Sequence, residues 1–188
     1  MPTLAWSPYF DPFEGGFTIE VPTGWLVYGG IIRYEIEHPA ILLCAEAPDH
    51  KTYFQLGTPE PTVYQTPTFG QPEAGRALRY QTGLDYARGY SRRAIAPQYP
   101  NLVVTVERER PDLTQGPWAA ANPQCPHRGG EVRFTCTRSG EPAEGSAAAD
   151  NYLVPTLPMF SGLWGIDFFA AMIVPLGRSK QSFHRSGI

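Results

Sequence analysis

Short segments in which apolar and polar residues alternate recur along this chain, and they constrain its fold more than any other feature. The alternation is clearest in residues 17–21 (Phe-Thr-Ile-Glu-Val) and 132–136 (Val-Arg-Phe-Thr-Cys). A period of two is typical of half-buried β-strands, because successive side chains in a strand point to opposite faces of the sheet. Residues 40–47 are almost continuously apolar, which predicts a central strand covered on both faces.

Glycine and proline separate these segments and indicate how they connect. The chain holds 19 Gly and 20 Pro in 188 residues, and they are spread along it as turn residues, which favours many short strands over long helices. Pro22-Thr23-Gly24 predicts a turn, Gly29-Gly30 a break, and residues 48–51 a further turn. Because the connections are short, the first third is predicted to be an antiparallel meander.

Further strands are expected in residues 102–107, 147–154 and 163–174, which gives about seven strands in all. One helix is predicted between them: Thr82 with Asp85 three residues later resembles a capping box, an apolar stripe follows at helical spacing, and Pro97 ends it. We therefore predict an α+β fold, a central antiparallel sheet with helical cover.

A chain of 188 residues fits one domain, and we predict a single globular domain over residues 1–188. Pro-rich loops are expected near 57–75 and 111–129, followed by a short basic tail at 176–188. The net charge of −3 argues against nucleic-acid binding, which normally needs a basic excess. The longest apolar run, 163–174, is interrupted by Asp167 and is too short to span a bilayer.

Two features predict a cytoplasmic location. The N-terminal residues lack the basic and apolar regions of a signal peptide. The three cysteines are an odd number, whereas secreted disulfide frameworks prefer even ones, so a reducing compartment is expected.

The segment from Phe17 to Trp25 resembles the opening of the Mog1/PsbP/DcrB-like superfamily, whose members begin with alternating apolar residues and Pro-x-Gly-Trp. The flanking residues 11–15 and 29–33 are similar to a widespread bacterial domain with the same opening. The resemblance implies an α/β/α sandwich around an antiparallel sheet. Its named members are binding proteins, namely a Ran-GTPase partner, an extrinsic photosystem II subunit and a periplasmic lipoprotein, and it supplies no catalytic residues.

The candidate metal ligands are Cys125, His127 and Cys136. Cys125-Pro126-His127 is similar to half of a Rieske iron–sulfur site, but a second Cys-x-x-His is missing, because Ser139 stands where the histidine is needed. The three residues could hold zinc with a fourth ligand, and Cys125 and Cys136 could instead form a disulfide. The alternation places Cys136 on the apolar side of its strand, so free thiols and no cofactor are the preferred interpretation.

No Gly-x-Ser-x-Gly elbow, Walker loop or dinucleotide fingerprint occurs, so a non-catalytic role is predicted. A docking surface is expected on the helix and the basic tail, because Tyr and Arg dominate interface hot spots. Its candidate residues are Tyr86, Arg88, Tyr90, Arg92, Arg93, Arg178, Lys180 and Arg185. The predicted function is an accessory or extrinsic subunit that binds a larger protein complex, such as a membrane-bound or photosynthetic one. A small-ligand or metal-binding domain is the alternative, and a hydrolase is the third hypothesis.

Overall fold

The structure, a computed structural model, describes residues 5–33, 39–67, 77–99, 101–154 and 162–176. Within these ranges the strands are β1 (Trp6–Phe10), β2 (Thr18–Pro22), β3 (Leu26–Arg33), β4 (Pro39–Glu46), β5 (Tyr53–Gly57), β6 (Val63–Gln65), β7 (Val103–Glu109), β8 (His127–Arg138), β9 (Glu141–Val154) and β10 (Leu163–Pro175). The helical segments are α1 (Gly83–Tyr90), η1 (Ser91–Ile95), η2 (Ala96–Gln98), η3 (Pro111–Thr114) and α2 (Pro117–Ala121).

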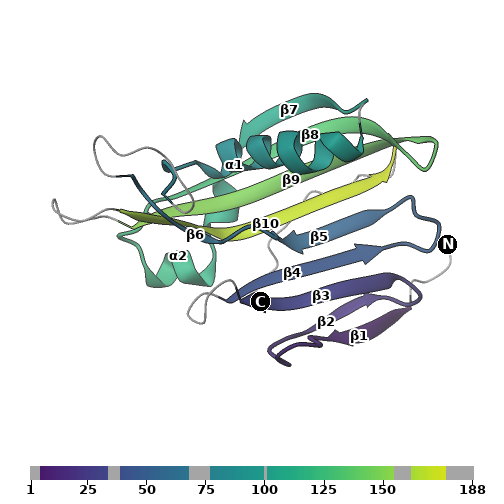
Figure 1. Ribbon diagram of the computed structural model, residues 1–188, viewed down its shortest axis with the longest axis horizontal. Helices are drawn as coiled ribbons and strands as arrows, with labels where there is room; N and C mark the ends of the chain where they lie inside the picture. The colour runs from purple at the N-terminus through teal and green to yellow at the C-terminus, as the bar shows by residue number, and fades with distance from the viewer. Residues whose placement is uncertain (1–4, 34–38, 68–76, 100, 155–161, 177–188) are drawn as a thin grey trace.

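One antiparallel sheet contains eight of the described strands (Figure 1). Its order is β3-β4-β5-β10-β9-β8-β7, and β6 pairs with β10 beside this path. The consecutive neighbours β3, β4 and β5 confirm the predicted meander. In β4, Leu43, Cys44 and Ala45 are buried in succession, so this strand is covered on both faces as its apolar run predicted.

The long strands β8, β9 and β10 form the middle of the sheet. β8 and β9 are joined by a two-residue turn in which Ser139 and Gly140 both have positive φ angles, 50° and 77°. Two consecutive left-handed residues are typical of the tight hairpin turn that matches the twist of antiparallel strands. The turn fixes the β8–β9 register along its whole length, from Arg138 opposite Glu141 to His127 opposite Tyr152.

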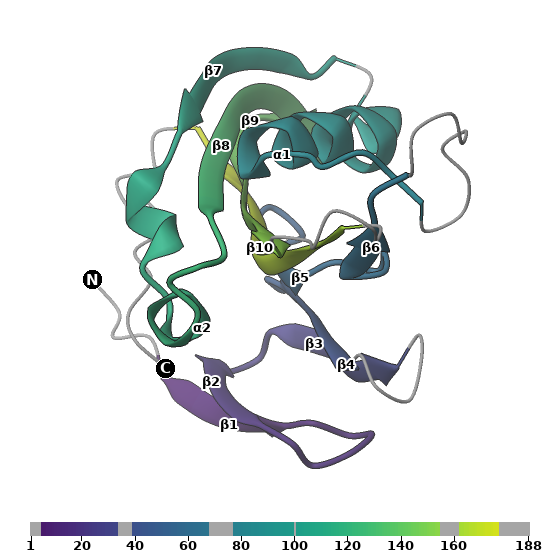
Figure 2. The same cartoon turned by 90° about the vertical axis from the view of Figure 1, so that its left-hand side faces the viewer.

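α1 covers one face of the sheet, and in Figure 2 the sheet curves around this helix, with β7 on one side and β6 and β10 on the other. Thr82 caps the helix as predicted, since its side chain accepts a hydrogen bond from the backbone N–H of Asp85. The helical path continues through η1 and η2 to Gln98, one residue beyond the predicted end at Pro97. A side chain at Gly130 would overlap Leu84, so glycine at this position lets the helix approach β8 closely.

The hydrophobic core lies between α1 and the sheet. Val132, Phe134 and Cys136 point into it from β8, which confirms the strand predicted from their alternation. Tyr86, Tyr90 and other aromatic side chains pack against them from the helix and from β10. The chain is therefore mostly antiparallel sheet with one longer helix.

Three local predictions are wrong. β2 pairs with β1 in a separate two-stranded sheet, whereas a hairpin of β2 with the following strand was expected. β3 runs through Gly29-Gly30 without a break, because Gly29 adopts a φ of 111° and passes close to the backbone of Leu42. The expected loops contain regular structure: β6 lies within 57–75, and η3, α2 and the start of β8 lie within 111–129.

β7 is the outer strand of the sheet at the β8 side, and all seven of its residues are exposed. Its register with β8 shifts between Val104 and Val106, which places a bulge in this edge strand. Within the described ranges, no helix has the length and apolar character needed to cross a lipid bilayer.

Candidate metal-binding site

His127 and Asp150 form a buried pair on the face of the sheet opposite α1. His127 is the first residue of β8 and stands opposite Tyr152, while Asp150, two residues before Tyr152 on β9, stands opposite Gly129. Both side chains therefore project from the same face. The imidazole Nδ1 lies 2.7 Å from Oδ2 of Asp150, and the two side chains are 6% and 0% exposed.

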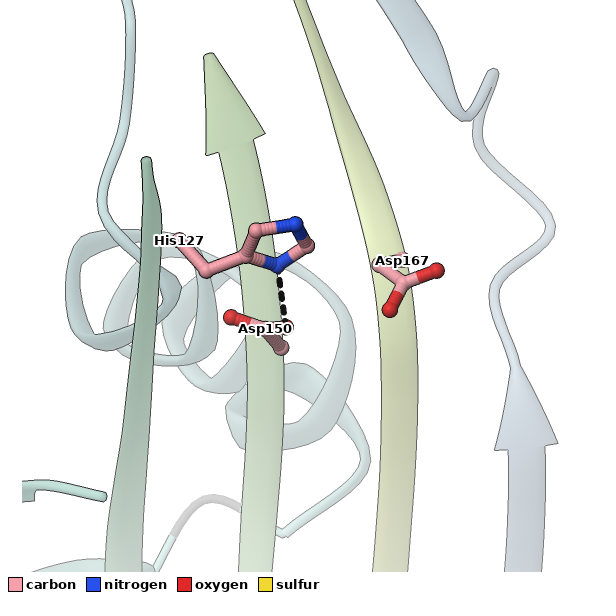
Figure 3. A group of neighbouring side chains, drawn as sticks. All are labelled: His127, Asp150 and Asp167. Atoms are coloured by element: carbon pink, nitrogen blue, oxygen red, sulfur yellow. Dashed lines mark hydrogen bonds and ion pairs between the residues drawn. The ribbon is translucent and has the colours of Figure 1, made fainter. Parts of the chain in front are cut away.

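A β-bulge adds a second carboxylate. The β9–β10 register shifts between Ile166, opposite Asn151, and Phe168, opposite Asp150, so Asp167 is the extra residue of β10. Bulges redirect side chains and are common beside functional sites. One ligand atom from each of His127, Asp150 and Asp167 lies within 4.8 Å of the others, and Figure 3 shows the three side chains grouped across the neighbouring strands.

Two aromatic rings cover the imidazole. The ring centroid of Trp118 lies 5.3 Å from that of His127 and 4.2 Å from that of Tyr152. Trp118 reaches this position from α2, whose first residue is Pro117. Asn122 caps the C-terminal end of this helix, and its side-chain amide donates a hydrogen bond to the Trp118 carbonyl. Tyr152 lies flat against β10 because its strand partner, Gly165, has no side chain to obstruct it.

The hydrogen bond to Asp150 orients the imidazole. An ionised carboxylate only accepts, so Nδ1 is the donor in this pair, and the neutral tautomer that makes this bond has its lone pair on Nε2. Nε2 is buried and has no hydrogen-bond partner among the described residues. Figure 3 shows Nδ1 turned toward Asp150 and the second ring nitrogen on the side of the imidazole away from that bond, with Asp167 on the neighbouring strand β10. The group thus combines one imidazole nitrogen donor with two carboxylates.

The electrostatic surroundings of the site are negative. Burial, followed by the charge of Asp150, raises the pKa of Tyr80 to about 12. Burial likewise raises the pKa of Tyr152, with further contributions from Asp167 and Cys125. Both shifts are due first to burial; the carboxylates of Asp150 and Asp167 add to them, and the charge of Arg128 opposes the shift of Tyr80.

Two cavities adjoin the site. One of about 130 Å³ is bordered by His127, Pro111 and Thr114. The other, of about 280 Å³, is bordered by Asp167 and by apolar side chains of β4, β5 and β10.

The chain matches no family model and no curated protein. The geometry of the site is thus the basis for inferring a function.

The structure corrects the predicted ligand set. His127 belongs to the group, but Cys136 lies nine residues further along β8, about 30 Å away at the rise of a strand, and on the opposite face. Cys125 and Cys136 are buried free thiols, so both the three-residue zinc site and the disulfide are wrong. Asp150 and Asp167 were missed as members of the group, and the available signal was a single acid inside each of the apolar segments 147–154 and 163–174.

The predicted docking residues are only partly on the surface. Tyr86 and Tyr90 are buried in the core, 1% and 4% exposed, so they are not available to a partner. Arg88 pairs with Asp85 and Glu107, and Arg93 pairs with Glu60. Arg92 is exposed. The remaining candidates, Arg178, Lys180 and Arg185, lie outside the described residues.

Proposed function

We propose that this protein binds a divalent metal ion at the group of His127, Asp150 and Asp167, with His127 and Asp167 as ligands and Asp150 as the outer-shell partner of the imidazole. The observation that carries the proposal is the Nε2 atom of His127, which is buried without a hydrogen-bond partner among the described residues, on an imidazole grouped with two carboxylates. Buried polar atoms in native proteins nearly always have a partner, and an ion is one of the explanations for an exception. The metal-binding alternative formulated from the sequence is therefore favoured, with a different set of ligands.

The three side chains have distinct roles. His127 offers the Nε2 lone pair, and Asp167 offers a carboxylate oxygen. Asp150 accepts a hydrogen bond from Nδ1–H of His127, as carboxylates commonly do for metal-bound histidines. It also adds a second negative charge to the group. Because one donor is an imidazole nitrogen, the site suits Zn²⁺, Fe²⁺, Co²⁺ or Mn²⁺ better than Mg²⁺ or Ca²⁺, which prefer oxygen alone.

Titration calorimetry of the purified chain with ZnCl₂ tests the proposal. We expect one Zn²⁺ per chain for the wild type and no measurable binding for His127→Gln. The matched control is His50→Gln, since the His50 side chain is 67% exposed in the turn between β4 and β5. Equal binding by the wild type and by His127→Gln, or no binding by the wild type, would contradict the proposal.

The hydrolase hypothesis has less support. A nucleophilic mechanism needs a serine or cysteine hydrogen-bonded to the histidine that activates it. Among the described residues none is bonded to Nε2 of His127, and Nδ1 is bonded to Asp150. In the His127–Asp150 pair the imidazole can act as a metal ligand, and the carboxylate holds the imidazole in position. We therefore propose a binding role for this site.

A second candidate function, docking on a larger protein, rests on a different surface. The aromatic side chains of Trp6, Phe10 and Phe13 in and after β1 are 56%, 64% and 66% exposed. Exposed aromatic residues in one short segment are typical of an interaction surface. This observation fits the accessory or extrinsic subunit expected from the resemblance to the Mog1/PsbP/DcrB-like superfamily, with the contact on β1 in place of the helix.

Native electrophoresis of cell extract tests the docking role. We expect the chain to migrate with a larger particle, and the double variant Phe10→Ser, Phe13→Ser to migrate alone. Val103→Ser, on the exposed strand β7 of the main sheet, is the control and should leave migration unchanged. A wild-type chain that migrates alone at every salt concentration would contradict this role.

A further inference from the structure

The larger cavity beside the group of His127, Asp150 and Asp167 lies where the strand that pairs with β10 changes from β6 to β5. β6 pairs with β10 from Leu163 to Gly165, and β5 pairs with it from Ala170 onward. Residues 166–169 lie between these two ladders, and the bulge that displaces Asp167 falls in the same interval. The cavity of about 280 Å³ opens there.

The lining of this cavity is largely apolar. Ile41, Leu56 and Phe168 contribute from three different strands. Among the described residues that line it, Asp167 is the one that carries a charge. The same carboxylate is one of the proposed metal ligands, so Asp167 belongs both to the cavity and to the proposed ion site.

A metal held by these side chains keeps coordination positions for a further ligand. Metal sites with three or fewer protein ligands are typically completed by water or by a bound molecule. Without the ion, Asp167 would repel an anion from the cavity. With the ion in place, an oxygen donor at the Asp167 end is attracted, while the apolar walls favour a hydrocarbon tail.

We propose that this cavity binds a small apolar carboxylate whose carboxylate group coordinates the metal ion. The inference rests on the proposed metal-binding function and adds the class of ligand. Ligand pockets usually have volumes of about 300–1,000 Å³, so a cavity of this size fits a short hydrocarbon chain. Hexanoate is therefore the probe.

Calorimetry of hexanoate with zinc-loaded and zinc-free protein tests the inference. We expect hexanoate to bind the loaded protein at least 10-fold more tightly than the zinc-free protein. Hexanol, which has the same tail without the carboxylate, should not show this dependence on zinc. Hexanoate binding that is equal with and without zinc would overturn the inference and leave the metal-binding function intact, whereas absence of zinc binding would overturn both.

Two variants locate the site in the cavity. Leu56→Trp fills it from β5, and Ile41→Trp blocks it at a position that is 41% exposed and thus tolerant of substitution. Each folded variant should bind zinc like the wild type and lose hexanoate binding. Val106→Trp, which fills a separate cavity of about 220 Å³, is the matched control and should retain both.

Unchanged hexanoate binding in both cavity variants would overturn the inference. An amine ligand paired with Asp167 is the competing occupant. Tight binding of hexylamine to the zinc-free protein, abolished by Asp167→Asn, would therefore overturn it as well.

Discussion

Asp150 and Asp167 approach each other across the β9–β10 ladder because one extra residue in β10 displaces Asp167. In an unbulged ladder, residue 167 would be the direct partner of Asp150 or Asn151 and would follow the regular alternation. The bulge frees its side chain from that alternation and brings it to the imidazole. The predictions below concern this group and its surroundings.

Asp150→Asn should weaken zinc binding without abolishing it. The amide can still hold the imidazole but carries no charge, and loss of an outer-shell carboxylate commonly lowers metal affinity about 10–100-fold. Competition with a chelating dye measures the affinity. A variant with wild-type affinity would show that Asp150 neither supports the imidazole nor contributes its charge.

Zinc should raise the thermal stability of the protein. At a free Zn²⁺ concentration 100 times the dissociation constant, binding to the folded state alone adds about 2.7 kcal/mol to the free energy of unfolding. For a chain of this length that corresponds to an increase of roughly 5–10 °C in the unfolding midpoint. Differential scanning calorimetry measures the shift, and the His127→Gln variant should show none.

Trp118 should report on occupancy, because its ring lies over the imidazole at 5.3 Å. We expect Co²⁺, an open-shell ion that suits nitrogen and oxygen ligands, to quench its fluorescence. In Trp118→Phe the quenching should disappear while Co²⁺ still binds, since Trp6, Trp25 and Trp164 remain as unaffected emitters. Quenching that persists in this variant would place the ion elsewhere.

Glu131 should make stability depend on pH. Its side chain is 1% exposed and contacts Arg108, Arg110 and Arg133. Burial alone would raise the pKa of this carboxyl, but the three arginines hold it below its usual value. A lowered pKa in the folded state gives stability that is complete above the unfolded-state pKa and is lost as the pH falls through the folded-state pKa.

Urea denaturation of the wild type and Glu131→Gln at pH 7 and pH 3 measures this effect. At pH 7 the variant should be less stable by about 3 kcal/mol, because buried Arg110 loses its buried carboxylate partner and keeps its ion pair with the exposed carboxylate of Asp112. At pH 3 the difference should shrink, since Glu131 of the wild type is then increasingly protonated. A difference that is equal at the two pH values would contradict the assignment.

Much of the fold could be predicted because local patterns specify it. The alternation in 132–136, the capping residue Thr82 and the turn in residues 48–51 all agree with the elements they produce. β1 was missed because Pro8 interrupts its short sequence, and proline argues against a strand. Tyr86 was placed on the surface, but its hydroxyl bonds to Thr58 and Glu60, partners 26 or more residues away that allow it to be buried.

The site was less predictable because its members come together only through strand register. His127 was recognised as a possible ligand, but its neighbours in the sequence are not its neighbours in space. Asp150 reaches it through the pairing of β8 with β9, and Asp167 through the bulge in β10. Neither the register nor the bulge has a signature in a single sequence.

The bulge in β7 affects whether this edge strand can pair with a strand of another copy of the protein. An outer strand with exposed Val103, Val104 and Val106 offers hydrogen-bonding groups and apolar surface that another strand could extend. The register shift between Val104 and Val106 interrupts the regular spacing of these hydrogen-bonding groups. A straight strand from another copy therefore cannot pair with β7 along its whole length. A bulge of this kind is one of the ways in which natural edge strands avoid pairing with strands of other molecules.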